Sequence, residues 1–123
     1  MTGILVLLLL GHGAAHLVGF MGPWRLIDNE GVTFQRSLFD GRLEVSDRGM
    51  RALGVVWLGL ALGFFAAGLA AAFQLPWWPE AAMGLAVASL LMCVTSWPAA
   101  RIGVAVNVVL LVGLQVARAS HWL

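Results

Sequence analysis

The chain has 123 residues, of which 61% are hydrophobic and 11% are charged, and its formal net charge is +1. A soluble domain carries about 25% charged residues, so this much apolar surface requires lipid as its solvent. The small net charge gives no electrostatic footprint for nucleic acid, and the length fits one domain.

Four apolar segments have about the length that crosses the hydrocarbon core of a bilayer, which takes about 20 residues. They are expected at residues 3–21, 52–73, 80–97 and 102–123. The first has no positively charged start, which favours a retained helix over a cleaved signal peptide. Pro76, Pro79 and Pro98 break the chain in two short linkers, and Trp77 and Trp78 suit the membrane interface. We therefore predict an all-α integral membrane domain over residues 1–123, an antiparallel up-down-up-down four-helix transmembrane bundle.

The arginines predict the orientation of these spans, because cytoplasmic loops carry an excess of positive charge. Six arginines fall on one side of the predicted bundle, and only Arg118 lies near the other. The six are Arg25, Arg36, Arg42, Arg48, Arg51 and Arg101. We expect a multi-pass protein of a bacterial cytoplasmic (inner) membrane, with loop 22–50 in the cytoplasm and both termini outside.

The loop at residues 22–50 contains a hairpin signal, LFDGRL, because Asp-Gly is favoured in a two-residue type I′ turn. VTFQRSLF before it and RLEV after it are candidate strands; an idle loop or a short amphipathic piece on the membrane is the alternative. Ser46 is expected to cap the second span, with Asp47 complementing the helix dipole.

Small residues recur at every fourth position in two of the spans, which suits close helix packing in lipid. The first span has Gly11, Ala15 and Gly19, and the second has a stripe at residues 59, 63 and 67. We expect these faces to pack inside the bundle, so they are weak evidence for an oligomer.

Polar side chains inside the spans need a partner or a function, because they are costly in lipid. His12 and His16 share one face of the first span. Ser89, Cys93 and Ser96 share a face of the third, and the fourth holds Asn107 and Gln115. Counting residues from the helix ends places His12 level with Gln115, His16 level with Asn107, and Ser89 near the middle. If these faces meet, the bundle encloses a small polar interior.

This polar interior has several interpretations. The side chains could only satisfy one another and fix the helix register, or they could bind a ligand through His12, His16, Ser89, Asn107 and Gln115. Haem is a minor alternative, because two histidines on one helix face cannot hold the iron from both sides without His121 or a second copy. A metal site is not expected: no acid or further histidine matches the depth of the pair, and the single cysteine excludes a cysteine-rich site. No catalytic residue is predicted.

Several stretches carry a resemblance. GHGAAHLVGF, RALGVVWLGLAL and SWPAARIGVAVNVVLLV resemble a set of uncharacterised four-span bacterial membrane proteins, some labelled transporter permease. Their first helix has an HG-x-x-H-x-x-GF-like pattern, and their later part an S-x-x-x-x-W-x-x-A-x-x-G-x-x-x-N-like pattern. The resemblance implies four spans and draws attention to His12, His16, Trp97 and Asn107. The wide DNEGVTFQRSLFDGRLEV loop departs from it.

We therefore expect a small non-catalytic membrane protein, either an accessory or assembly subunit or a binder of a small lipophilic ligand in the polar interior. The alternatives are a membrane-embedded haem or quinone redox protein that uses His12 or His16, and a subunit of a transporter. Besides the lipid bilayer, the expected partners are a larger membrane complex or a second copy of the chain.

Overall fold

The computed structural model describes residues 2–27 and 36–123. The elements of this part of the chain are α1 (Thr2–Met21), β1 (Ser37–Leu38), β2 (Leu43–Glu44), α2 (Asp47–Ala72), α3 (Trp78–Thr95) and α4 (Arg101–Ala119). At about 1.5 Å of rise per residue, the helices are about 27–39 Å long. All four are long and apolar enough to cross a membrane, which confirms the predicted class of an all-α bundle of membrane-spanning helices.

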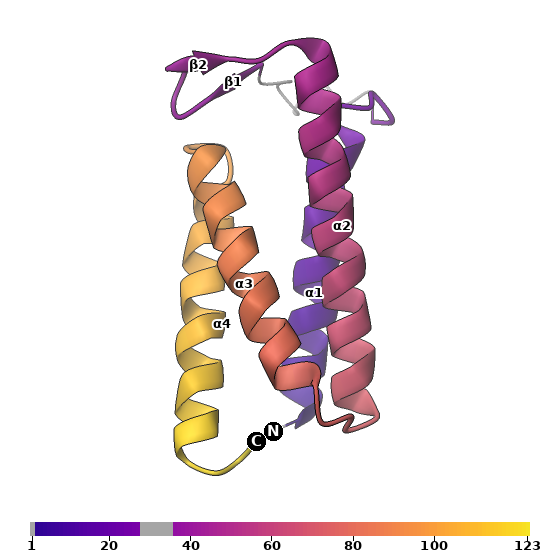
Figure 1. Ribbon diagram of the computed structural model, residues 1–123, viewed down its shortest axis with the longest axis vertical. Helices are drawn as coiled ribbons and strands as arrows, with labels where there is room; N and C mark the ends of the chain where they lie inside the picture. Colours follow the sequence, from indigo (N-terminus) through magenta and orange to yellow (C-terminus); the bar gives the residue numbers. More distant parts are fainter. Residues whose placement is uncertain (1, 28–35) are drawn as a thin grey trace.

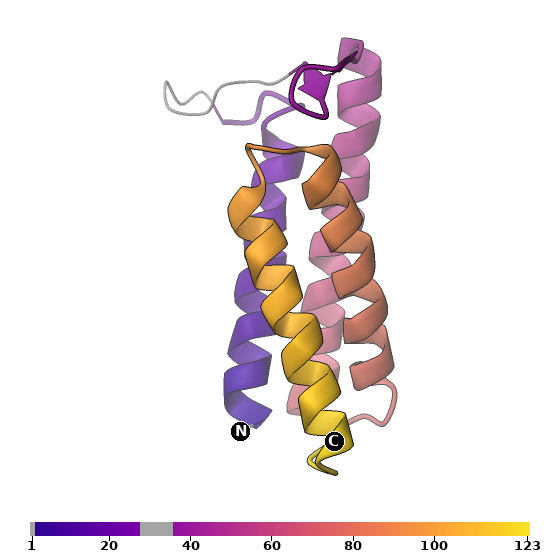
Figure 2. The ribbon, with the colours of Figure 1, turned by 90° about the vertical axis from the view of Figure 1, so that its left-hand side faces the viewer.

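The helices are arranged as two pairs. α1 packs along α2, α3 packs along α4, and α2 also contacts α3, whereas α1 and α4 have few close backbone approaches. Both chain termini lie at one end of the bundle, and the β1–β2 hairpin lies at the other (Figures 1 and 2). The structure therefore brings the hairpin above the ends of α3 and α4 (Figure 1).

Two helices differ in length from the predicted spans. α2 begins at Asp47 instead of residue 52, because the Ser46 side chain accepts a hydrogen bond from the Gly49 N–H, as expected for an N-cap. α4 ends at Ala119 instead of residue 123. There the amides of Ser120 and Trp122 turn back to the carbonyls of Val116 and Ala117, and this closes the helix end.

α3 spans Trp78–Thr95 instead of the predicted 80–97. It begins earlier because Pro79 lies in its first turn, where the missing proline N–H is not needed. It ends earlier because Pro98 disfavours the helical conformation at the residue before it. In its first turn Glu80 pairs with Arg118 of the last turn of α4, at 3.5 Å, so each charge complements the dipole of its own helix.

The hairpin is present, with a longer loop than predicted. β1 and β2 are antiparallel with Leu38 opposite Leu43, so four residues connect the strands instead of two. Asp40 and Gly41 both have positive φ, as the centre of a type I′ turn requires. Phe39 also has a positive φ, and its amide donates to the Thr95 carbonyl at the end of α3, which ends the ladder. The part of the expected strand at residues 32–35 lies outside the described residues.

The glycines at the helix contacts differ in part from those of the predicted stripes. A Cβ at Gly11 or Gly59 would meet nothing within 4 Å, so these two are wrongly assigned to a packing face. α1 approaches the backbone of α2 at Gly13, where a Cβ would lie 3.0 Å from the Ala61 carbonyl oxygen. At Gly19 and Gly63 the predicted packing is confirmed, since a Cβ would overlap the side chain of a neighbouring helix.

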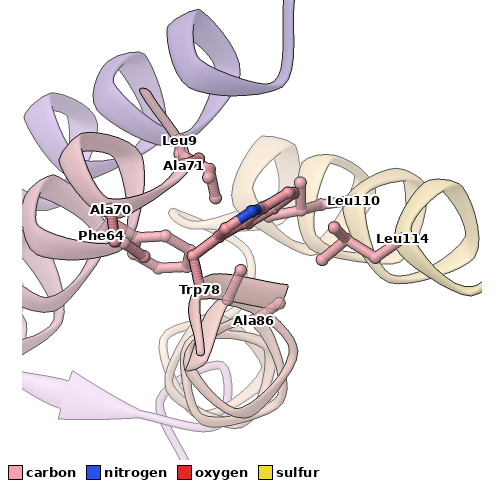
Figure 3. Close-up of a cluster of buried hydrophobic side chains, with 10 residues drawn as sticks. Leu9, Phe64, Ala70, Ala71, Trp78, Ala86, Leu110 and Leu114 are labelled. Carbon is pink, nitrogen blue, oxygen red and sulfur yellow. The ribbon is translucent and has the colours of Figure 1, made fainter. Parts of the chain in front are cut away.

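The apolar core lies between the helices on the side of the chain termini, away from the hairpin. Trp78 is only 5% exposed, and Figure 3 shows its indole among Leu9, Ala71 and Leu110 from the other three helices. The Trp78 ring is therefore covered by the other helices, whereas Trp77 is exposed, as an interfacial side chain would be. A large ring at the start of α3 fills the space that the alanines of α2 and α3 leave open.

Candidate functional site

The centre of the bundle holds a network of four buried polar side chains from three helices. These are His12 and His16 of α1, Ser89 of α3 and Asn107 of α4, and none of them is more than 8% exposed. The two imidazole centroids are 4.5 Å apart, because residues four apart on a helix lie one above the other. The structure thus brings together four of the five predicted site residues.

Asn107 connects the other members of the network. Its Nδ2 donates to the Gly103 carbonyl one turn earlier at 2.8 Å and to Ser89 Oγ at 2.7 Å. Since a carbonyl oxygen only accepts, this contact fixes which end of the amide is nitrogen. The Oδ1 of Asn107 then faces His12 Nε2 at 3.0 Å, so this ring nitrogen carries the proton and donates.

His16 uses both of its ring nitrogens. Its Nδ1 lies 2.7 Å from the His12 carbonyl oxygen, so Nδ1 carries a proton and donates. Its Nε2 lies 2.7 Å from Ser89 Oγ. In the neutral ring Nε2 accepts the Ser89 hydroxyl proton, and Ser89 Oγ in turn accepts from Asn107. Every member of this chain of hydrogen bonds is then satisfied.

One ring nitrogen stays outside the network: Nδ1 of His12 makes no hydrogen bond within the described residues. In that part of the chain every fully buried side-chain nitrogen or oxygen has a partner, so Nδ1 is accessible from outside the network. Because His12 donates through Nε2, its Nδ1 in the neutral ring is a bare lone pair.

Two aromatic side chains of α2 support the imidazoles. Phe64 stands edge-to-face against His12, with ring centroids 4.8 Å apart, and Trp57 lies 5.1 Å from His16. We missed this contribution from the sequence, because α2 has no polar residue at this depth. The available signal was the spacing of the two aromatic residues, which are seven apart and so share one helix face.

Gln115, the fifth predicted site residue, lies outside the network and is exposed on α4. The prediction that it is level with His12 is wrong, and so is the pairing of His16 with Asn107. The prediction counts His16 from the end of α1 and Asn107 from the start of α4, as if these two helix ends were level. In the structure Asn107 lies six residues from Arg101, whereas its partner His12 lies nine residues from Met21. The end of α1 therefore extends beyond the start of α4 by about one helical turn, and Ser89 is the partner of His16.

A pocket of about 370 Å³ opens beside the network towards the hairpin end of the bundle. Its lining includes the buried side chains of His12, His16 and Cys93, together with Trp57. Its rim includes apolar side chains of α1 and α4 that are exposed, namely Val18, Ile102 and Val106. The pocket is therefore bordered by both α1 and α4.

The pocket has the size and lining of a small-molecule site. Such sites commonly have about 300–1,000 Å³ and combine an apolar lining with a few polar groups that orient the ligand. Apart from the two histidines, the lining has no titratable side chain other than the Cys93 thiol. In the described residues no lysine, arginine, aspartate or glutamate contributes to it.

The arrangement offers little to a metal or to haem. No group of three or more histidine, cysteine, aspartate or glutamate side chains within residues 2–27 and 36–123 could hold a metal ion. His16 has both ring nitrogens engaged, so His12 Nδ1 is the one nitrogen of the pair that is open to an iron atom. His121 follows the far end of α4, whereas the pocket lies at residues 102–106 of that helix.

Ser89 and His16 have the hydrogen bond of a nucleophile and its general base. A substrate would have to reach Ser89 Oγ. However, Ser89 is 0% exposed and is not part of the pocket lining. The pair therefore acts within the bundle as a structural contact.

Comparison of the chain with known protein families, curated proteins and solved structures finds no match. The resemblance to four-span bacterial membrane proteins thus stays a prediction, and the chemistry of the pocket is the basis on which function is argued.

Proposed function

We propose that the chain crosses a bacterial inner membrane four times, up-down-up-down, with the hairpin end in the cytoplasm and both termini outside. The arginine distribution supports this orientation. Arg25 and Arg36 both pair with Asp47 at the start of α2, and Arg42, Arg48, Arg51 and Arg101 belong to the hairpin or to the first turns of α2 and α4. The resemblance of the histidine-bearing helix supports the bacterial assignment.

Cysteine labelling in intact cells tests this orientation. Glu44→Cys in the hairpin and Ser120→Cys beyond α4 are both at exposed positions, and native Cys93 is buried. A membrane-impermeant maleimide is expected to label Ser120→Cys from outside and to label Glu44→Cys only after lysis. Labelling of Glu44→Cys in intact cells would reverse the orientation.

Within the membrane, we propose that the protein binds a small lipophilic ligand in the pocket between α1 and α4. The observation that carries this function is an accessible ring nitrogen without a protein partner, His12 Nδ1, on a largely buried residue that lines an otherwise mostly apolar pocket. A bundle that only fixed its own register would gain from satisfying every polar atom. The open nitrogen beside the pocket favours a bound molecule over a polar network that only fixes the helix register.

Two neighbouring alanines of α1 provide the test. Ala15 lines the pocket, and Ala14 does not; both are exposed. Ala15→Phe is expected to fill the pocket and to remove a small molecule that co-purifies with the wild-type protein, whereas Ala14→Phe retains it. Native mass spectrometry from detergent, followed by solvent extraction, measures the loss. Equal retention by both variants would show that the co-purifying molecule does not occupy this pocket.

The same preparation tests haem. If His12 Nδ1 ligates haem, the purified protein shows a Soret absorbance band that Ala15→Phe weakens. A flat visible spectrum favours the lipophilic ligand.

A further inference from the structure

The hydrogen-bond network specifies more than the presence of a ligand. We infer that the ligand is a neutral amphipathic molecule whose polar end is a hydroxyl that donates a hydrogen bond to His12 Nδ1. This inference rests on the proposed function, because it concerns the same pocket. It names the chemical class of the occupant: a lipophilic alcohol or phenol.

The direction of the hydrogen bond follows from Asn107. Its Nδ2 must face the Gly103 carbonyl, so its Oδ1 faces His12 and accepts the proton of Nε2. The other tautomer of His12 would set the Nε2 lone pair against Asn107 Oδ1 at 3.0 Å. Its remaining donor would be Ser89 Oγ at 3.4 Å, whose proton His16 Nε2 accepts at the shorter distance of 2.7 Å. The amide one helix away therefore holds the imidazole in the tautomer whose open nitrogen accepts, and the complementary ligand atom is a donor.

The charge of the ligand follows from the lining. An anionic head group would need a cation, and within the described residues the lining contains no arginine. A cationic head group would need a carboxylate, and the lining contains none in that part of the chain either. A charge in such surroundings would lose its hydration without compensation, so a neutral polar end is favoured.

The size and shape of the ligand follow from the volume and the rim. A volume of about 370 Å³ is at the small end of the range for small-molecule sites and is too small for a whole phospholipid with two acyl chains. The exposed rim residues Val18, Ile102 and Val106 are aliphatic, so a hydrocarbon tail can leave the pocket between α1 and α4 towards lipid. A ligand with one polar group inside the pocket and one apolar tail directed towards the lipid fits these features. A single-chain alkylphenol or alcohol has this form.

Matched probes test the inference on the full chain in lipid nanodiscs. The probes are 4-pentylphenol, 1-fluoro-4-pentylbenzene, which has a similar shape without the donor, and 4-pentylbenzoate, which is an anion. Binding is followed by ring-¹⁵N histidine NMR with the wild type, Ala15→Phe and Ala14→Phe. Binding to the pocket saturates with increasing probe concentration, whereas partitioning into the lipid does not. The Ala15→Phe protein in nanodiscs gives the signal that is due to partitioning alone.

Saturable binding of the phenol that is about tenfold or more tighter than binding of the fluoro analogue is the expected result, since one hydrogen bond accounts for about that factor. The unprotonated Nδ1 resonance of His12 should move with the phenol alone. Ala15→Phe should abolish binding, Ala14→Phe should retain it, and the benzoate should not bind.

Three results would overturn the inference. A His12 ring protonated on Nδ1 would reverse the hydrogen bond. Equal affinity for the phenol, the fluoro analogue or the benzoate, abolished by Ala15→Phe, would refute the hydroxyl donor and leave the proposed lipophilic site standing. Absence of saturable binding by all three probes would refute the inference and count against the proposed function as well.

Discussion

Replacing Asn107 by leucine is expected to lower the free energy of unfolding by about 2–4 kcal/mol, the largest effect of any single polar substitution in the bundle. Leucine keeps a similar size but removes the hydrogen bonds to Ser89 and His12. It also leaves the His12 Nε2–H with only a long contact, to Ser89 Oγ at 3.4 Å, in an apolar interior. An unpaired buried donor costs more than the lost bond itself contributes.

Gln115→Leu is the matched control for this variant. It changes an amide to leucine on the same helix, but Gln115 is exposed on α4 and belongs to no part of the network. A surface substitution of this kind is expected to change stability by less than about 0.5 kcal/mol. Reversible unfolding in mixed micelles with increasing SDS measures both variants. Equal stability of the two variants would contradict the central role assigned to Asn107.

The second large effect is expected for Gly13→Leu, which should lower the free energy of unfolding by about 1–3 kcal/mol through overpacking. A Cβ at this position would lie 3.0 Å from the Ala61 carbonyl oxygen and 3.1 Å from Phe64 Cβ. Neither atom is the end of a flexible side chain. The two helices must separate, which also displaces His12 from Phe64.

Gly11→Leu controls for the change of residue type. Gly11 is exposed two residues away on the same helix, and a Cβ there meets nothing within 4 Å. Because leucine has the higher helix propensity, this variant is expected to be neutral or up to about 1 kcal/mol more stable. The same SDS titration applies. A Gly13→Leu protein as stable as Gly11→Leu would mean that α1 and α2 do not approach closely at Gly13.

Much of the local structure could be predicted from the sequence, because it depends on neighbours along the chain. Composition gave four apolar helices, the cap at Ser46 opened α2, and Asp40–Gly41 formed the turn of the hairpin. Helix ends are less predictable beside proline, because proline can either end a helix or occupy its first turn. The sequence predicts a helix boundary at Pro79, but this residue lies within the first turn of α3.

The close helix contacts could not be read from spacing alone. Small residues at every fourth position indicate a helix face that another helix can approach closely. They do not show which helix packs against that face. Gly11 belongs to such a stripe and is exposed, whereas Gly13, outside it, contacts α2.

The position of His12 and His16 on one face of an apolar helix, and their need for polar partners there, can be predicted from the residue order alone. Both follow from the 3.6-residue period and the cost of polar groups in lipid. The identity of these partners depends on how the helices pack. The offset between the end of α1 and the start of α4 sets the depth of Asn107, and the rotation of α4 buries Asn107 while leaving Gln115 exposed. That pairing, through the fixed direction of the Asn107 amide, leaves His12 Nδ1 open beside the pocket.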